Sequence, residues 1–499
     1  MNYSVLYEKC IPVTMTDGTE NAFGIYDALI HAHEIQAIQC NSPLESFALL
    51  RLLTAFSMDM LQPKGIVDRQ DYLDSGAFDE DEIKQYIRLC EKDGPRFDLF
   101  DASHPFMLSE FVPQTDEKAL KSASALSIGR PSGNNHVFLD HRLEEDAVMT
   151  PAEAFRATLA LYLFCTAGAQ GYPSGVNNTP PVYSCINGKN LYETIILNMT
   201  AVRECAPLEY GAELVPWRRG RPVVPKEESV SISLLEGLTW QPRRITLFAD
   251  EDGQVRRICL QQGKNFRGND LWRDPFVSYR YNEKSGWNSV KPQAGRALWR
   301  DVGTLITDKS KLHSAPPLVI RQAAEMLEES CLLLSIHSVA MVTNQASYVE
   351  WMEDDLSLPV LFFKDYGSAA LLRADVDETE SMQSGLRKAV NTYFCNDKKH
   401  SDMLSDQAQA YFLSRMHDVI FGKAIPDLLE ISTDLSVAKQ AEHVRRFGSW
   451  MKEALEQSFR NVVECGGTKS DILRNQVEAY RYAMNIYTKN QKEREAAYE

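Results

Sequence analysis

Three groups of residues in this chain are of types that could support chemistry: a histidine-rich tetrapeptide, a loop containing glycine and serine, and several Gly-Lys pairs. His31 and His33 are two positions apart, whereas zinc-binding histidines on one helical face are four apart, so this pair does not predict a metal site. Ser174 comes one position too late in residues 171–175 for a nucleophile elbow. No Gly-Lys pair is followed by the Ser or Thr of a P-loop. We therefore predict no catalytic residue, no metal and no cofactor.

The composition is that of a globular protein. Of 499 residues, 44% are hydrophobic and 24% are charged, and no apolar run approaches the ~18 residues of a membrane span. Residues 1–10 lack the apolar stretch of a signal peptide. The ten cysteines form no C-x-x-C pair, which is typical of reduced, mostly buried thiols. We expect a cytoplasmic protein with no membrane partner.

The net charge of −16 is unevenly distributed. Residues 1–200 carry 14 Lys and Arg against 27 Asp and Glu, residues 201–300 carry 17 against 12, and residues 301–499 carry 22 against 30. The basic middle segment permits two interpretations. It could form a local anion-binding surface, because phosphates respond to local potential, or its arginines could pair with the acidic flanks.

Local signals indicate a mixed α/β first part. A cap, a helix-start proline and a glutamate begin helices at Ser42 and Thr150, and a further helix is predicted over residues 25–38. Strand-like segments are expected at Val230–Leu235, Arg244–Phe248 and Arg256–Leu260.

From about residue 370 helical periodicity dominates, and apolar residues recur every three or four positions in four stripes. The spacing predicts an α+β fold: an irregular mixed α/β N-terminal domain over residues 1–365, followed by an antiparallel four-helix bundle over residues 366–499. The four stripes are Met382, Leu386, Val390 and Phe394; Phe412, Met416, Val419 and Ile420; Val437, Ala441, Val444, Phe447, Met451, Leu455, Phe459 and Val462; and Leu473, Val477, Tyr480, Met484 and Tyr487.

Six short segments, in this order, resemble CasA, the large subunit of the type I-E CRISPR Cascade complex. Each is weak alone, but their shared order, spacing and total length extend the resemblance over essentially the whole chain. The segments are Ile11-Pro12-Val13, Ser42-Pro43-Leu44-Glu45, His104-Pro105-Phe106-Met107, Leu238-Thr239-Trp240-Gln241-Pro242, Asn344-Gln345-Ala346-Ser347 and Leu386-Arg387-Lys388-Ala389.

The resemblance implies a function that is not enzymatic. A CasA-like subunit recognises the protospacer-adjacent motif on double-stranded DNA, promotes strand separation and R-loop formation, and recruits the trans-acting helicase-nuclease. Its partners are the guide RNA, the double-stranded target DNA and the other Cascade subunits (the backbone, small and 5′-handle-binding subunits). Some CasA-like subunits carry a cysteine cluster before the lysine segment, and Asp250–Arg257 contains no cysteine, so no metal is expected there.

The resemblance also implies DNA-binding residues. Lys264 matches a lysine that reaches into the minor groove, whose acceptors suit a flexible donor; the alternative is a solvent-exposed lysine in a turn. Asn344, Gln345 and Ala346 match a minor-groove contact and a wedge that unstacks base pairs; the alternative is a polar hairpin tip without function.

Two loops complete the implied site. Residues 171–175 match a glycine-rich loop near the DNA, where Gly171 and Gly175 would permit close approach because they lack a Cβ; the alternative is an ordinary surface loop. Asn135 and Phe138 match a loop on the 5′ handle of the guide RNA and could hydrogen-bond and stack there, although Phe138 could equally be a core residue.

Two other functions stay open. A scaffold subunit could anchor the 5′ handle and dock partners while another subunit reads DNA. An enzyme could carry a site that none of the searched motifs describes.

Overall fold

The computed structural model describes residues 2–110, 119–129, 147–166, 172–268, 272–306, 314–327, 332–344, 347–394, 398–466 and 468–498. The chain divides into two compact units. The N-terminal unit comprises Met1–Leu298, Leu312–Glu328 and Leu332–Leu358, and the C-terminal unit comprises Trp299–Lys311, Glu329–Cys331 and Pro359–Glu499. The division thus falls at residue 358 rather than at 365, and residues 299–311 belong with the C-terminal helices.

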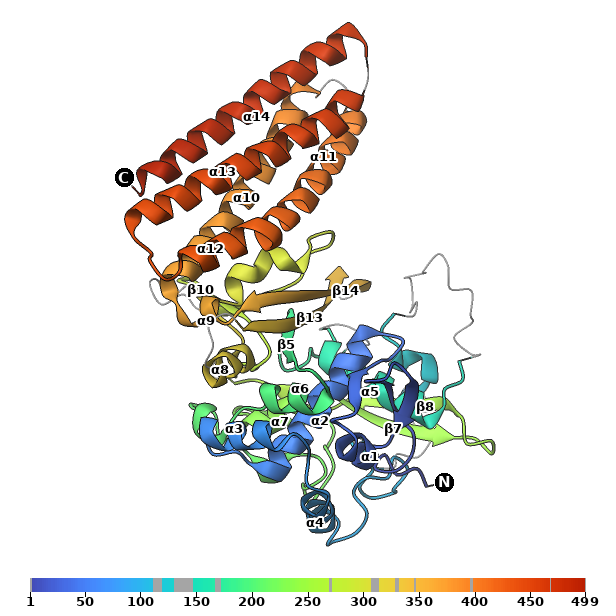
Figure 1. The fold of residues 1–499 in the computed structure, drawn as a ribbon. Coiled ribbons are helices and arrows are strands. Elements are labelled where there is room, and N and C mark those ends of the chain that lie inside the picture. The colour runs from blue at the N-terminus through green and yellow to red at the C-terminus, as the bar shows by residue number, and fades with distance from the viewer. Residues whose placement is uncertain are drawn as a thin grey trace. The chain divides into compact units, whose positions relative to one another are not determined.

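Small sheets and short helices build the N-terminal unit (Figure 1). Its sheets have the strand orders β2-β1-β3, β4-β8-β7, β11-β10-β12, β14-β13-β5 and β6-β9. The strands are β1 (Ile11–Met15), β2 (Glu20–Phe23), β3 (Ile35–Ile38), β4 (Leu120–Ser122), β5 (Tyr183–Asn187), β6 (Glu228–Ser229), β7 (Arg243–Ala249), β8 (Val255–Gln262), β9 (Asn265–Phe266), β10 (Tyr279–Asn282), β11 (Gly286–Ser289), β12 (Ser314–Ala315), β13 (Leu333–Asn344) and β14 (Ser347–Pro359). The helices are α1 (Ile25–Ile30), α2 (Pro43–Leu61), α3 (Ile66–Ser75), α4 (Glu80–Cys90), α5 (Pro151–Phe164), α6 (Leu191–Asn198), α7 (Leu234–Leu238) and α8 (Leu318–Met326).

Helices α2 and α5 pack against each other at the centre of this unit. Both begin at their predicted caps: the Ser42 hydroxyl accepts from the Leu44 amide, and Thr150 and Glu153 form a reciprocal capping box. Because residues on every side of α2 are buried, this helix crosses the core instead of covering it.

Two predicted elements of the N-terminal unit are wrong. The helix expected over residues 25–38 ends at Ile30, and Ile35–Ile38 pairs with β1 as β3 instead. The strand expected at Val230–Leu235 is not formed, because the chain turns into the short helix α7 at Leu234, and the Leu235 carbonyl accepts a helical hydrogen bond from the Thr239 amide.

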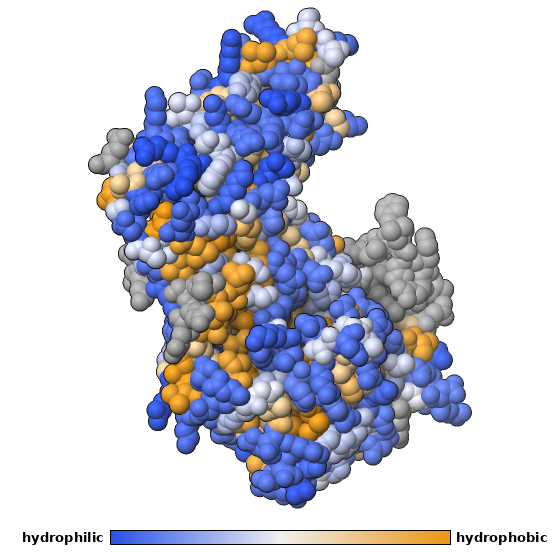
Figure 2. Space-filling view, in the orientation of Figure 1, coloured by the Kyte–Doolittle hydropathy of each residue, from blue (hydrophilic) through white to orange (hydrophobic). Residues whose placement is uncertain are grey.

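The C-terminal unit is helical, as predicted. Helix α10 packs against α11 and α14, and α13 also packs against α11 and α14 (Figure 1). Figure 2 shows these helices covered mostly by hydrophilic residues. The helices are α9 (Leu361–Lys364), α10 (Tyr366–Tyr393), α11 (Lys398–Val419), α12 (Ile425–Ile431), α13 (Val437–Ser458) and α14 (Ser470–Ala496), with π-helical turns at Ile420–Ala424 and Phe459–Val463.

The predicted stripes of α10 and α11 are buried, as are the central residues of the third stripe, from Val444 to Phe459. The fourth stripe is wrong: Leu473 and Val477 are about half exposed, and Ala479 and Ala483 are buried instead. Helix α14 packs against both α10 and α13, and at one point the approach is very close, since a Cβ at Gly448 of α13 would lie 2.3 Å from the side-chain oxygen of Gln491. The small residues Ala479 and Ala483 on α14 are buried where larger apolar residues were expected.

No helix in the described parts of the chain is both long enough and apolar enough to cross a bilayer.

Candidate nucleic-acid interface

The hairpin of β13 and β14 carries the first predicted contact residues. Ser335–Val339 of β13 pair with β5, so the rest of β13 extends beyond the third strand and is paired only with β14. Asn344 ends β13 and is exposed. Gln345 and Ala346 stand between β13 and β14 in the sequence and lie outside the described residues. Of the three predicted contact residues, the structure thus describes Asn344, and it is exposed.

The strand that follows this tip is acidic. Glu350, Glu353, Asp354 and Asp355 all lie on β14, and their charges repel phosphates. His337 Nδ1 lies 2.9 Å from Asp355 Oδ1, and this hydrogen bond lowers the pKa of the Asp355 carboxyl, which therefore keeps its negative charge. The carboxylates along β14 therefore make the length of this strand electrostatically unsuited to contact with DNA.

Lys264 does not project into solvent. Its side chain is 3% exposed, its Nζ lies 2.5 Å from Glu236 Oε1, and it lies 5.2 Å from the centre of the Trp240 ring. Burial lowers the pKa of the ammonium group, and the neighbouring carboxylate of Glu236 opposes that shift. The predictions of a lysine reaching the minor groove and of an exposed turn lysine are both wrong for this structure.

The backbone explains why Lys264 is buried. A Cβ at Gly263 would lie 2.5 Å from the Gln241 carbonyl oxygen, and the Lys264 amide donates to the same oxygen at 2.9 Å. The turn after β8 is therefore pressed against the start of β7, which directs the lysine inward. No sequence motif signals this contact, because it depends on the pairing of two strands.

Replacing Lys264 with methionine is expected to lower the free energy of unfolding by about 1–3 kcal/mol, because Glu236 loses its buried partner. Adding Glu236→Gln should restore most of that loss. Urea unfolding measures both, with Lys121→Met, a change at an exposed lysine, as the control. Equal, negligible effects at positions 264 and 121 would contradict the buried pair.

The glycine loop is anchored to the N-terminal unit. Arg243 of β7 donates from Nη1 to the Pro173 carbonyl at 2.7 Å, and its guanidinium lies 5.3 Å from the centre of the Tyr172 ring. Gly175 is half-buried, and a Cβ there would lie 3.3 Å from Cys165 Sγ. The close approach that Gly175 permits is therefore made to the end of α5 within this chain. Gly171 lies outside the described residues.

The predicted guide-RNA residues Asn135 and Phe138 also lie outside the described residues.

Acidic residues pair with several arginines of the basic middle segment. Arg218 pairs with Asp59 of the acidic N-terminal flank at 2.9 Å and Arg244 with Glu110 at 3.4 Å, as the second interpretation of the charge expected. Other pairs lie within the segment itself and leave its net charge unchanged, such as Arg219 with Glu227 at 3.0 Å and Arg256 with Asp250 at 2.7 Å.

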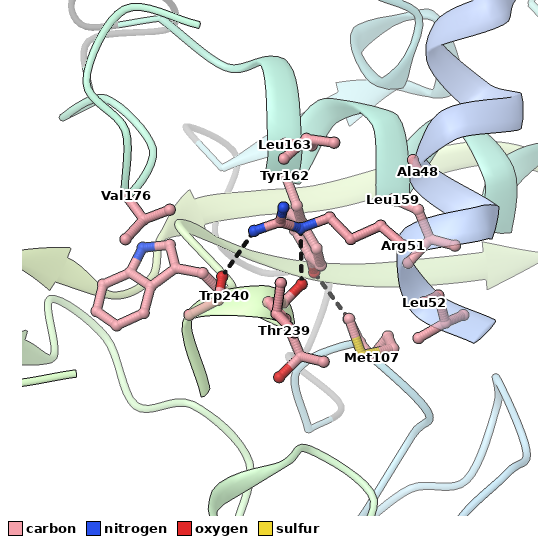
Figure 3. Close-up of a pocket in the computed structure, with 12 residues that line it drawn as sticks. Ala48, Arg51, Leu52, Met107, Leu159, Tyr162, Leu163, Val176, Thr239 and Trp240 are labelled. Atoms are coloured by element: carbon pink, nitrogen blue, oxygen red, sulfur yellow. Dashed lines mark hydrogen bonds between the residues drawn. The ribbon is translucent and has the colours of Figure 1, made fainter. Parts of the chain in front are cut away.

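A buried ion pair of Arg51 and Asp274, which sequence reasoning missed, lies beside the loop. Arg51 of α2 donates from Nη1 to Oδ1 at 2.9 Å and from Nη2 to Oδ2 at 2.7 Å, and Asn177 of the loop donates to Oδ2 at 2.8 Å. Figure 3 shows Arg51 also donating to main-chain oxygens of the α7 segment. The two ions are 223 residues apart in the sequence, so no local pattern could have revealed them.

The cavity in Figure 3 does not suit a cofactor. It has a volume of about 30 Å³ and is lined by Leu52, Leu159, Val176 and Trp240 among others. That space holds roughly two water molecules. No group of three or more His, Cys, Asp or Glu residues in the described ranges is arranged to bind a metal.

These features define a class of protein: a mixed α/β unit followed by a helical unit, with a polar hairpin tip as its candidate site. The model of the CRISPR-associated protein Cse1 family matches residues 5–460. The chain belongs to this family, which confirms its resemblance to CasA.

Individual relatives support the same assignment. A CasA/Cse1 protein of Thermus thermophilus is 28% identical over 368 residues, which are 72% of this chain and 71% of that protein. The crystal structure of Thermobifida fusca Cse1 matches with a TM-score of 0.79 at 18% identity, covering 98% of both chains. A chain of a CRISPR RNA-guided surveillance complex matches with a TM-score of 0.76 at 17% identity, covering 97% of this chain and 99% of that one. The structural matches show a shared fold.

Proposed function

We propose that this chain is the large subunit of a type I-E Cascade complex in the cytoplasm. It recognises the protospacer-adjacent motif on double-stranded DNA, promotes strand separation and R-loop formation, and recruits the helicase-nuclease. It catalyses no reaction itself and works with the guide RNA and the other Cascade subunits. The main support for this proposal is that residues 5–460 match the Cse1 family. The fold shared with a chain of an RNA-guided surveillance complex supports it further.

The proposed reading element is the hairpin tip, Asn344, Gln345 and Ala346. The amide side chains of Asn and Gln donate to the acceptors that the minor groove displays. A small residue beside them can enter between base pairs, and the unstacking costs a few kcal/mol per step. The two strands of β13 and β14 supply a stiff support, because the tip is held by pairing along both of its arms. Lys264 has no part in this reading, since its ammonium group is buried against Glu236.

We propose supporting roles for two loops. The loop of Gly171 and Gly175 lies at the DNA backbone, and its anchoring by Arg243 reduces the entropy lost on binding. Asn135 and Phe138 bind the 5′ handle of the guide RNA and hold the subunit in the complex.

The test uses the complex reconstituted with guide RNA and two duplexes that differ only in the motif. Asn344→Ala together with Gln345→Ala should reduce discrimination between the duplexes by roughly five- to 150-fold, the equivalent of losing a base contact of about 1–3 kcal/mol. Asn21→Ala, a change at an exposed asparagine of the edge strand β2, is the matched control and should leave discrimination unchanged.

The same experiment separates the alternatives. Under the scaffold hypothesis the tip variant discriminates between the two duplexes as well as the parent does. Binding is then weakened only by Asn135→Ala and Phe138→Ala, because these changes release the subunit from the guide RNA. Hydrolysis of DNA or RNA by the purified chain, lost on replacing one acidic residue or histidine, would instead support an enzyme.

A further inference from the structure

A second hairpin in the N-terminal unit carries a row of aromatic rings that runs from the core to solvent. Strands β10 and β11 are antiparallel, with Tyr279 opposite Ser289 and Tyr281 opposite Trp287. Because alternate residues of a strand share a face, Tyr279, Tyr281 and Trp287 lie on one side of the hairpin. Tyr279 is 9% exposed and Tyr281 is 42% exposed. The outer ring of the row is therefore available to a ligand.

The side chain of Trp287 packs against the ring of Tyr281, and Arg273 in turn packs against Trp287. The ring centres of Tyr281 and Trp287 are 5.5 Å apart in an edge-to-face arrangement. The guanidinium of Arg273 lies 4.5 Å from the centre of the Trp287 ring and 5.6 Å from that of Tyr279. Asp274, the residue after Arg273 in the chain, is fixed by its buried pair with Arg51. The rings are thus ordered before any ligand arrives, which lowers the entropy cost of binding.

The segment of the sequence that carries this row is basic. Residues 273–296 contain five cationic residues (Arg273, Arg280, Lys284, Lys291 and Arg296) and two acidic residues (Asp274 and Glu283). Asp274 is buried and neutralised by Arg51, which leaves Glu283 as the exposed carboxylate of the segment. Trp351 on β14 is similarly exposed, at 44%, but its strand carries four carboxylates. One of them, Glu350, accepts a hydrogen bond from the Gly295 amide at 3.2 Å and so lies at the far end of the basic segment from Arg273.

We infer that Tyr281, supported by Trp287 and Arg273, is a stacking platform for an unpaired base of a single-stranded nucleic acid. Aromatic rings combined with cations are the chemistry that holds single strands, since each base offers a flat face and each nucleotide a phosphate. Bases inside a duplex are already stacked on each other and cannot use such a ring. The platform is separate from the β13–β14 tip, and the inference does not depend on motif reading.

Fluorescence anisotropy on the full chain tests this inference with labelled oligothymidylate, oligouridylate and a duplex of equal length. Tyr281→Ala should weaken single-strand binding by roughly five- to a hundredfold, the effect of losing one base-stacking ring, whereas Tyr281→Phe should bind like the parent. Because Tyr281 is exposed, neither change should impair folding. Arg273→Gln should weaken binding and also reduce its dependence on salt.

Tyr7→Ala is the matched control. Tyr7 is 59% exposed and pairs with Tyr26 at a ring distance of 5.7 Å, and neither ring has an arginine stacked on it among the described residues. This variant should bind single strands like the parent. Tighter binding of either oligonucleotide supports the platform, and the preference between them distinguishes an RNA strand from a DNA strand as the natural ligand.

Four results would overturn the inference: no single-strand binding by the parent, equal binding of duplex and single strand, unchanged binding by Tyr281→Ala, or an equal loss in Tyr7→Ala. If Tyr281→Ala weakened only the association with another protein subunit, the hairpin would be a protein-docking surface and the inference would be wrong. Loss of motif discrimination in the tip variant has no bearing on these measurements, so the two proposals can fail separately.

Discussion

Asp274→Ala is expected to destabilise the N-terminal unit by about 3–5 kcal/mol, because it leaves the guanidinium of Arg51 buried without its counter-ion. Arg51 is 3% exposed and Asp274 is 1% exposed. The carboxylate also accepts from Asn177 at 2.8 Å and from the Phe276 amide at 3.1 Å. One substitution therefore disconnects α2, the glycine loop and the segment before β10.

Urea unfolding followed by tryptophan fluorescence measures this loss, since five of the seven tryptophans lie in the N-terminal unit. The matched control is Glu228→Ala, which removes an exposed pair with Arg267 at 2.9 Å and should cost about 0–1 kcal/mol. The double variant Arg51→Met with Asp274→Ala should be more stable than Asp274→Ala alone, because no unpaired charge remains buried. An effect of Asp274→Ala no larger than that of Glu228→Ala would contradict this account.

The second large effect concerns a buried histidine in the C-terminal unit. His443 of α13 is completely buried, with Nδ1 2.6 Å from Asp427 Oδ2 and Nε2 2.9 Å from Asp375 Oδ2. Only the doubly protonated imidazolium can donate to both carboxylates. The same carboxylates also bind arginines: Arg446 to Asp427 at 3.0 Å, and Arg494 to Asp375. The network links α10, α12, α13 and α14.

This geometry predicts a pH dependence of stability. Burial by itself lowers the pKa of His443, but the carboxylates of Asp375 and Asp427 outweigh it, and the net shift is upward. Glu378, a further carboxylate near Arg494 and Asp375, has its own pKa raised by burial. A histidine whose pKa is raised by folding contributes its full stability below the unfolded pKa of about 6.5 and loses it as the pH rises through the higher folded value. The C-terminal unit should therefore become less stable above neutral pH.

His443→Gln should lower stability by about 3 kcal/mol at pH 6, because it removes one partner from a buried charge network, and should abolish this part of the pH dependence. Hydrogen–deuterium exchange of the amides of α10 and α13 reports on this unit alone. His417→Gln, a change at a histidine that is 44% exposed on α11, is the control. The exchange rates of the parent protein, corrected for intrinsic pH effects, should rise between pH 6 and pH 9. Rates that stay constant over this range would contradict the prediction.

The elements predicted correctly are those whose signals are local. The caps at Ser42 and Thr150 form within one helical turn, and the apolar stripes of α10 and α11 follow from helical periodicity alone. The missed elements depend on distant partners. Ile35–Ile38 is a strand because β1 is beside it, and Ala479 and Ala483 of α14 are buried because α10 and α13 pack against that helix.

The candidate site likewise has features that the sequence could predict and features that depend on contacts between distant segments. The ordered set of short segments indicated the Cse1 family and the hairpin tip at Asn344, because a family pattern is carried by residue identity and spacing. The accessibility of Lys264 could not be predicted, because it depends on the contact between Gly263 and Gln241 across two strands.

The sequence by itself thus determined the helix starts, the helical C-terminal region and the family, all of which depend on residues near each other in the chain or on their order. Only the tertiary structure decided which charges are buried and paired. Arg51 and Asp274 are 223 residues apart, and His443 and Asp375 are 68 apart. The free energy of a charge is set by its solvation and by the ions within a few ångströms of it, and these exist only once distant segments have packed together.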